Sequence, residues 1–226
     1  MSDTAPNPDH RRARQQRGIR RTVAILVAVV AVVVGLQVYK VTREPALDRE
    51  ALREQGTLVF EQPRRVSAFE LVDHRGETFT PEQLKGQWTL AFFGFTQCPD
   101  ICPMAMAELA RTMEALPPEL AERTQVLLVT LDPARDTPEV LAEYVPYFHE
   151  DFVGVTGEFL TLKRLANEVN VAFAKVTQSD DDYTVDHSGN IVLFNPMGDY
   201  HGFFKPPFDP TRLAEHYGSI VAAFPH

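Results

Sequence analysis

The chain has 226 residues, of which 44% are hydrophobic and 23% charged, as in a globular protein with enough apolar side chains to build a core. The formal net charge is −9, but residues 1–21 carry six arginines against Asp3 and Asp9, a local charge of +4 that leaves −13 on residues 22–226. An acidic body of this kind repels nucleic acid, and the sequence has no basic stripe or stacking motif. We therefore expect no nucleic-acid partner.

The basic tail precedes an uncharged apolar run, Thr22–Tyr39, which has 18 residues and one late polar side chain, Gln37. As a helix rising about 1.5 Å per residue, this run nearly spans the ~30 Å hydrocarbon layer of a membrane. Arginines on one flank place that flank in the cytoplasm. We expect a cytoplasmic tail (1–21) and a single-pass anchor (22–39) in the inner, or cytoplasmic, membrane. The rest of the chain then lies on the periplasmic side.

Two other interpretations of the apolar run are a cleaved signal peptide and a buried core helix. A signal peptide usually has a shorter apolar core and a small-x-small cleavage site, and no clear site of this kind is present. A core helix would carry a polar face, and Thr22–Tyr39 has none. The membrane anchor is therefore the favoured interpretation.

After the anchor, residues 43–62 are charged and only weakly periodic, so we expect a juxtamembrane linker over 40–62 and a folded domain over 63–226. The domain opens with a hairpin pattern around the turn Asp73–Gly76. Two continuous apolar runs follow, which are typical of central strands covered on both faces. They span Trp88–Phe95 and Thr124–Leu131, with a helix expected between them from Pro99 to Leu116.

The second half of the domain continues to alternate. Thr137 is a good N-cap for a helix that starts at Pro138. The later predicted elements are a strand at 152–157, a helix at Glu158–Val169, a strand at 171–176, an acidic loop at 178–183, two strands about the turn Asn195–Gly198, and a last helix from about Pro210. Strands alternating with helices indicate an α/β fold with parallel strands, ending in an antiparallel hairpin. We expect a thioredoxin-like central sheet flanked by helices.

The two cysteines of the chain, Cys98 and Cys102, lie four residues apart at the point where a central strand gives way to a helix. Open α/β sheets bind ligands outside the carboxyl ends of their strands. If the helix begins at Pro99, the two side chains share one face with Cβ atoms about 5–6 Å apart. The helix N-terminus should then lower the pKa of both thiols.

The spacing of the thiols helps to choose among three roles: a structural disulfide, a redox-active pair and a metal site. A structural disulfide would close a very short loop and would stabilise the fold little, even in an oxidising compartment. Thioredoxin-type catalysts usually have the spacing C-x-x-C, whereas this chain has C-x-x-x-C. The spacing favours a metal site without excluding redox work. Two thiolates with an imidazole suit copper in either oxidation state.

A third ligand would have to be one of seven histidines. His10 lies in the tail and His226 ends the chain, while His201 falls in a predicted strand. The positions expected at the surface are His74, His149 and His216. His187 precedes an apolar strand and has Asp186 and Ser188 beside it to orient the ring. The residues alone do not single out one of these histidines.

Three segments, FGFTQCPDICPMAMAEL, TLDPARDTPEVLAEY and VDHSGNIVLFNPMGDY, resemble in this order the motifs of the Sco/SenC family. The resemblance covers about Ser67 to the C-terminus, and it implies membrane-tethered, thioredoxin-like copper proteins that help to assemble cytochrome c oxidase. It also implies that copper binds Cys98, Cys102 and His187. One departure is Gln97, where family members often have a histidine. For Asp132 and Arg135 we expect only a structural role at a strand end.

The resemblance implies a copper metallochaperone that delivers its metal to the dinuclear copper site of cytochrome c oxidase subunit two. The alternative is a membrane-anchored thiol-disulfide oxidoreductase, with Cys98 and Cys102 as a redox-active pair that reduces the cysteines of that site before metallation. A thiol peroxidase with the same fold is a weaker third hypothesis. Other periplasmic copper chaperones or thiol reductants are the expected further partners.

Overall fold

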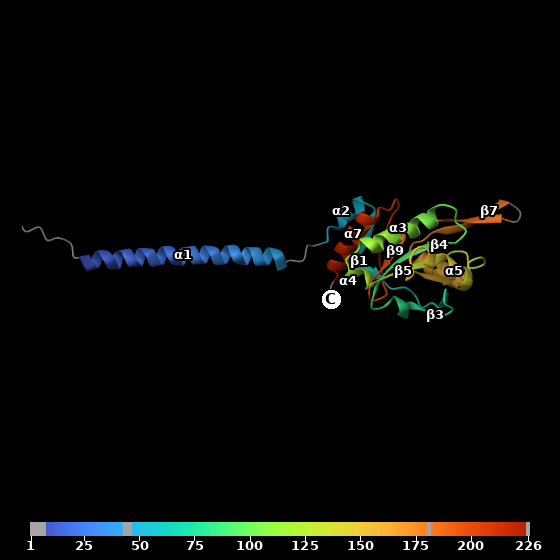
Figure 1. Cartoon of the computed structure of the whole chain (residues 1–226), viewed down its shortest axis with the longest axis horizontal. Coiled ribbons are helices and arrows are strands. Elements are labelled where there is room, and N and C mark those ends of the chain that lie inside the picture. The colour runs from blue at the N-terminus through green and yellow to red at the C-terminus, as the bar shows by residue number, and fades with distance from the viewer. Residues whose placement is uncertain (1–7, 43–46, 180–181, 225–226) are drawn as a thin grey trace, which may run out of the picture. The chain divides into compact units, whose positions relative to one another are not determined.

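The computed structural model describes residues 8–42, 47–179 and 182–224. The chain divides into two units, Met1–Ala46 and Leu47–His226. The first contains the helix α1, Pro8–Thr42, drawn in blue in Figure 1. Within α1, Arg20–Gln37 is exposed along its whole length and has a mean hydropathy of 1.9. It is long and apolar enough to cross a membrane.

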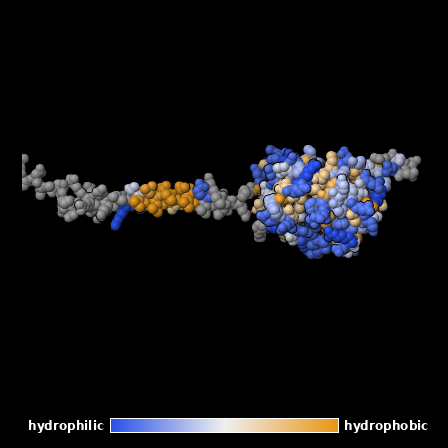
Figure 2. All heavy atoms as spheres, viewed as in Figure 1, coloured by the Kyte–Doolittle hydropathy of each residue, from blue (hydrophilic) through white to orange (hydrophobic). Residues whose placement is uncertain are grey.

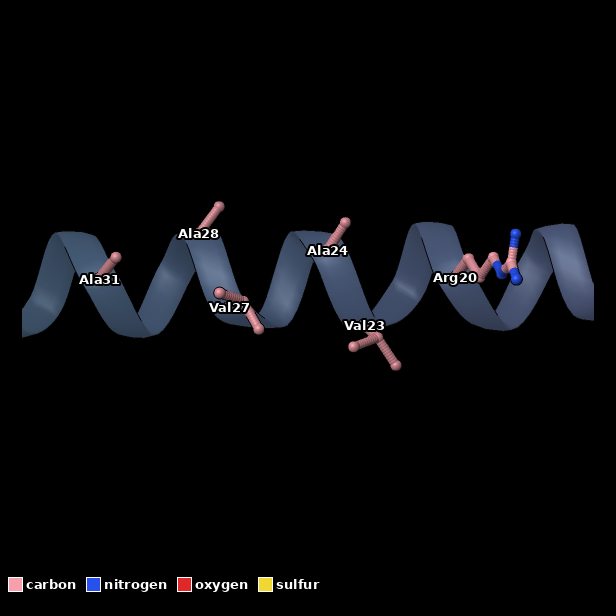
Figure 3. Close-up of a pocket in the computed structure, with 6 residues that line it drawn as sticks. All are labelled: Arg20, Val23, Ala24, Val27, Ala28 and Ala31. Atoms are coloured by element: carbon pink, nitrogen blue, oxygen red, sulfur yellow. The ribbon is translucent and has the colours of Figure 1, made fainter.

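The apolar segment of α1 forms the continuous hydrophobic band in Figure 2. Figure 3 shows part of its surface, where Ala24 and Ala28 project from the same side of the helix and leave a shallow recess next to Val27. A helix that is apolar on every side and exposed on every side fits a lipid environment better than water.

The second unit is built on a mixed sheet of eight strands in the order β1-β10-β9-β4-β5-β6-β2-β3. The strands are β1 (Thr57–Arg64), β2 (Leu71–Asp73), β3 (Thr78–Phe79), β4 (Trp88–Gly94), β5 (Thr124–Thr130), β6 (Val153–Thr156), β9 (Ile191–Phe194) and β10 (Tyr200–Phe204). The strands β4, β5 and β6 are parallel, and all other pairings are antiparallel. The expected α/β sheet with a closing antiparallel hairpin is confirmed.

Helices cover the sheet. They are α2 (Arg49–Glu54), α3 (Ile101–Ala115), α4 (Pro118–Ala121), α5 (Pro138–Tyr144), α6 (Phe159–Glu168) and α7 (Pro210–Ala222), with short 3₁₀ turns η1 (Pro81–Leu84) and η2 (Val145–Tyr147). The helix α3 packs against α7, and α5 packs against β6 (Figure 1). Every residue of β4 and β9 is buried, as their continuous apolar sequences predict for strands at the centre of a sheet.

The segment predicted as a linker, 40–62, is folded from Leu47 onward, while residues 43–46 lie outside the described part of the chain. The helix α2 and the strand β1 belong to the globular unit, which begins at Leu47. The strand β1 pairs with β10 through Thr57 and Phe204 and buries Val59, while α2 buries Leu52. The segment is charged because only one side of each element faces the core.

His216 is also buried, although the sequence placed it at the surface. Its Nδ1 lies 2.7 Å from Oγ1 of Thr57, and its Nε2 lies 3.3 Å from Oε1 of Gln55. This histidine therefore ties α7 to the beginning of β1, the element that the sequence pattern missed.

The predicted acidic loop is for the most part a hairpin of its own. The strands β7 (Phe173–Ser179) and β8 (Asp182–His187) pair antiparallel and form a second, two-stranded sheet. Figure 1 shows this hairpin extending away from the main sheet. The strand β8 ends at His187, so the hairpin carries one of the predicted site residues.

Candidate metal centre

The two cysteines lie in and after the turn that joins β4 to α3. The N-cap of α3 is Asp100 and the helix begins at Ile101, two residues later than predicted. Cys98 precedes the helix, and its N–H donates to the carbonyl of Phe95 at 3.3 Å. Cys102 lies in the first turn of α3 and is fully buried, and Cys98 is 9% exposed. Both thiols are free.

Gly94, the last residue of β4, provides the space that the Cys102 thiol occupies. A Cβ atom at this position would lie 2.8 Å from Sγ of Cys102 and 2.8 Å from Cε1 of Phe92. Contacts this short do not occur between real side chains, so any larger residue would displace the sulfur or the ring. The FGF sequence before the cysteines therefore has a steric reason for its glycine.

His187 reaches the same place from β8. Its Nε2 lies 3.4 Å from Sγ of Cys102, and its Nδ1 lies 3.3 Å from the carbonyl oxygen of Ser188. A carbonyl only accepts hydrogen bonds, so Nδ1 carries the proton and Nε2 presents a lone pair to the sulfur. The rings of Phe92 and Phe95 meet the imidazole edge-on, with centroids 5.8 and 6.1 Å away.

The ligand atoms of Cys98, Cys102 and His187 all lie within 4.8 Å of one another. Within the described part of the chain, no other group of histidine, cysteine and acidic residues comes together in this way. Metal–sulfur bonds of about 2.3 Å and metal–nitrogen bonds of about 2.0 Å bring such atoms to one ion after small side-chain rotations. Two sulfurs and one imidazole nitrogen suit a soft metal ion such as Cu(I).

Burial decides the protonation states of the site. It raises the pKa of the Cys102 thiol well above its usual range, and the neighbouring Cys98 adds to the effect. The expectation that the helix N-terminus would lower the pKa of this thiol is wrong, because desolvation in the core outweighs the helix dipole. Burial also lowers the pKa of His187, so its imidazole is neutral at pH 7 and ready to bind a metal. A metal ion that binds Cys102 must displace its proton.

Asp136 holds the loop that leads to Cys98. Its carboxylate accepts hydrogen bonds from the backbone N–H of Thr96 at 3.1 Å, the hydroxyl of Thr96 at 2.6 Å and the hydroxyl of Thr130 at 2.6 Å. The residue is completely buried, and burial raises its pKa. Thr130 ends β5, so Asp136 fastens the cysteine loop to the central sheet.

Arg135 connects the cysteine loop to the histidine hairpin. Its Nη1 donates to Oε1 of Gln97 at 3.0 Å and to the carbonyl of Tyr183 at 3.1 Å. Its guanidinium lies 3.8 Å from the centroid of the Tyr183 ring and forms an ion pair with Asp132. The Tyr183 hydroxyl in turn donates to Asp132 at 2.8 Å.

The DPARD sequence therefore has a role that sequence reasoning missed. We expected a strand-end role for Asp132 and Arg135, but their partners lie in two segments that are distant in the chain. The signal in the sequence was a group of charged residues directly after a buried strand, Asp132, Arg135 and Asp136. Such a group does not show which distant residues it contacts. Gln97, the departure from the family pattern, is the partner of Arg135 in the cysteine loop.

Two other histidines are excluded from the site. His201 is buried between the rings of Trp88 and Phe224, with centroids 5.3 and 5.5 Å away. His149 stacks on Phe152 and accepts from the N–H of Asp151. Neither belongs to the cluster of ligand atoms.

The fold and the cluster define a thioredoxin-like protein in which two thiols and an imidazole come together after the first parallel strand. The chain belongs to the SCO1/SenC family, whose model matches residues 60–222. It is similar to a protein of Stutzerimonas stutzeri described as a putative copper-binding protein, with 42% identity over 163 residues, 72% of this chain and 80% of that protein. It is 33% identical to protein sco1 of Schizosaccharomyces pombe over 207 residues, covering 90% and 78% of the two chains.

Solved structures confirm the fold. The crystal structure of yeast Sco1 with copper bound matches with a TM-score of 0.66 and 32% identity, and the alignment covers 72% of this chain and 91% of that one. Arabidopsis thaliana ScoI, also solved with copper bound, matches with a TM-score of 0.64 and 32% identity over 69% and 97% of the two chains. The predicted thioredoxin-like fold and family are therefore correct.

Proposed function

We propose that the protein is a copper metallochaperone that binds copper through Cys98, Cys102 and His187. The observation that carries this proposal is the convergence of these three side chains within 4.8 Å from two separate parts of the fold. The copper-bound structures of yeast and Arabidopsis relatives support copper as the metal. The acceptor that we propose is the dinuclear copper site of cytochrome c oxidase subunit two.

The three side chains supply two kinds of copper ligand, thiolate and imidazole. Cys98 and Cys102 lose their protons and supply the two soft ligands, while the neutral Nε2 of His187 supplies the third. Three ligands leave the ion open to an incoming thiolate or imidazole from the acceptor. Copper can then move by ligand exchange, with one bond forming as another breaks, so that no free ion enters solution. Nδ1 stays on the Ser188 carbonyl and keeps the ring oriented.

The test is to separate the three ligands by their chemistry, using the full chain in detergent. Cu(I) is satisfied by two thiolates, so His187→Ala should still bind one Cu(I) per chain. Cu(II) benefits from nitrogen, so the same variant should lose the native Cu(II) spectrum. Cys98→Ala or Cys102→Ala should impair both states, and His201→Ala should impair neither. Visible absorption, electron paramagnetic resonance and chelator competition report these states. An unaltered Cu(II) spectrum in His187→Ala would refute the ligand assignment.

A second candidate function is thiol-disulfide exchange, because the two thiols are neighbours and both are free. In this reaction the pair gives two electrons and two protons to a target disulfide and becomes the Cys98–Cys102 disulfide. Turnover of a disulfide substrate by copper-free protein would support this function. Stoichiometric copper binding with a sulfur-to-copper charge-transfer band would support the copper metallochaperone instead. One protein could perform both in turn, since the residues are the same.

We also propose that α1 is an uncleaved anchor in the inner membrane, with the basic tail in the cytoplasm and residues 47–226 in the periplasm. The arginines before an apolar, fully exposed segment at Arg20–Gln37 support this orientation. Protease added to intact spheroplasts should then remove the globular unit. Protection of that unit until the membrane is broken would reverse the orientation.

A further inference from the structure

An apolar groove of about 320 Å³ opens beside the metal centre. One wall is the outer side of α3, and the opposite wall is formed by the segments that follow β8 and β10. Its lining includes Phe92, Ile101, Met104, Glu108, Gly189 and Pro206. The volume lies at the lower end of the roughly 300–1,000 Å³ typical of ligand sites, which suits a side chain or two better than a large cofactor.

The groove lies next to the proposed metal centre, although none of the three proposed ligands lines it. Ile101 directly precedes Cys102, and Gly189 lies two residues after His187. Phe92 lines the groove and also packs edge-on against the His187 ring, at 5.8 Å between centroids. A protein that exchanges ligands at this centre therefore has the groove beside its contact surface.

Two features of the groove suit a partner protein. Ile101 and Met104 are three residues apart, so they share one face of α3, and they expose 42% and 54% of their surface in the groove. In addition, Oε2 of Glu108 is buried and has no hydrogen-bond partner among the described residues, while Oε1 accepts from Arg111 at 3.0 Å. A buried carboxylate oxygen without a partner is costly, and a donor would relieve that cost.

We propose that this groove receives the copper acceptor. The occupant is an apolar side chain of the acceptor that packs on Ile101 and Met104, next to an N–H or cationic group that donates to Oε2 of Glu108. The inference rests on the proposed function, because ligand exchange brings the acceptor to the metal, beside the groove. The acidic charge of residues 22–226 also favours an acceptor whose contact surface is basic.

The matched substitutions are Met104→Glu in the groove and Met197→Glu outside it. Both methionines are largely exposed, at 54% and 61%, so neither change should unfold the protein. Met197 lines a different cleft, beside Lys85 and Asp199. Glu108→Gln removes the negative charge at the groove and keeps the shape of the side chain.

The assay is transfer of Cu(I) from the full chain in detergent to the reduced, copper-free copper domain of cytochrome c oxidase subunit two. We expect Met104→Glu to raise the apparent KM for this acceptor about tenfold or more, because a carboxylate that packs against the acceptor's apolar side chain must lose its water, and this cost exceeds the weak attraction between exposed charges. Glu108→Gln should raise the apparent KM about threefold. Met197→Glu should match the wild type. Cu(I) affinity and the Cu(II) spectrum should be unchanged in all three variants, because none of these residues is a ligand.

The outcomes distinguish a failure of this inference from a failure of the proposed function. If the wild type transfers copper and Met104→Glu transfers it with the same KM, the groove does not receive the acceptor. If Met104→Glu abolishes self-association in sedimentation and leaves transfer intact, a second copy of this chain occupies the groove and the inference is again wrong. If the wild type binds copper but transfers none, the proposed acceptor is wrong, and the groove loses the occupant assigned to it.

Discussion

Replacing Arg135 by methionine tests whether the histidine hairpin is held in place by this one side chain. Methionine is of similar length and apolar, so it keeps much of the packing on Tyr183. It removes the hydrogen bonds to Gln97 and Tyr183 and the ion pair with Asp132. The hairpin that carries His187 then loses its polar connection to the cysteine loop.

The expected magnitude follows from burial. The side chains of Arg135 and Asp132 are 18% and 5% exposed, so the substitution leaves a carboxylate in the protein without its counter-ion. Breaking a fully buried pair in this way costs about 3–5 kcal/mol. The partial exposure of Arg135 and the remaining Tyr183 hydrogen bond reduce this to about 2–3 kcal/mol. If all of it acts on docking of the hairpin, Cu(II) affinity falls by roughly 30- to 150-fold.

Cu(I) affinity should change by less than about threefold, because it depends mainly on the two thiolates. Arg135→Lys should be intermediate, since lysine keeps the charge but has one nitrogen in place of two: Nη1, which donates to Gln97 and Tyr183, and Nε, which donates to Asp132. Lys85→Met is the control: it removes an ion pair whose partners are 50% and 71% exposed, which contributes at most about 1 kcal/mol. Chelator competition for each oxidation state and the Cu(II) paramagnetic resonance spectrum provide the readout. The reasoning fails if Arg135→Met lowers stability but leaves Cu(II) affinity and spectrum intact.

Three further predictions concern the site and its support. Oxidised protein should contain a Cys98–Cys102 disulfide and bind copper far more weakly than reduced protein, and equal affinities against one chelator would contradict this. Gly94→Ala should destabilise the fold by about 1–3 kcal/mol and perturb copper binding, because its Cβ would meet the Cys102 sulfur at 2.8 Å. Gly218→Ala is the control: it lies in α7 with nothing within 4 Å of the added Cβ, so it should be neutral or stabilising. Burial lowers the pKa of His201 to about 4. As pH falls below 6.5 the unfolded state therefore takes up a proton first, and up to about 3 kcal/mol of stability is lost by pH 4. His201→Gln should flatten this loss in urea unfolding followed by the fluorescence of Trp88, and an unchanged pH slope would exclude His201 as its source.

The sequence was sufficient for the parts of the fold that follow from local pattern. The strands β4 and β5 are continuous apolar runs, and Thr137 caps α5 through the N–H of Val140 as predicted. The sequence pattern was insufficient to predict β1, because the charged residues of this strand face solvent at the edge of the sheet. It also failed for the acidic segment, where a hairpin forms by pairing rather than by burial of alternate residues.

The site shows the same division between local and tertiary information. The spacing of Cys98 and Cys102 placed both thiols at the start of α3, which is local information. That His187 joins them at 3.4 Å from Cys102 depends on where the β7–β8 hairpin packs, and no local pattern encodes this. The raised pKa of the Cys102 thiol was missed for a similar reason, because desolvation by the surrounding core outweighs the helix dipole.

The proposed ligands are supported by two different parts of the fold. The cysteine loop is fastened to the central sheet by a fully buried carboxylate, Asp136, which accepts three hydrogen bonds. His187 lies on a separate two-stranded sheet, whose polar connection to that loop runs through Arg135 and Tyr183 near the surface. In the proposed copper site the two thiols are therefore supported by the central sheet and the imidazole by a separate hairpin. A substitution at Arg135 should for this reason perturb the imidazole alone, whereas a substitution at Asp136 should perturb the cysteine loop, and the two variants should differ in which oxidation state of copper they weaken most.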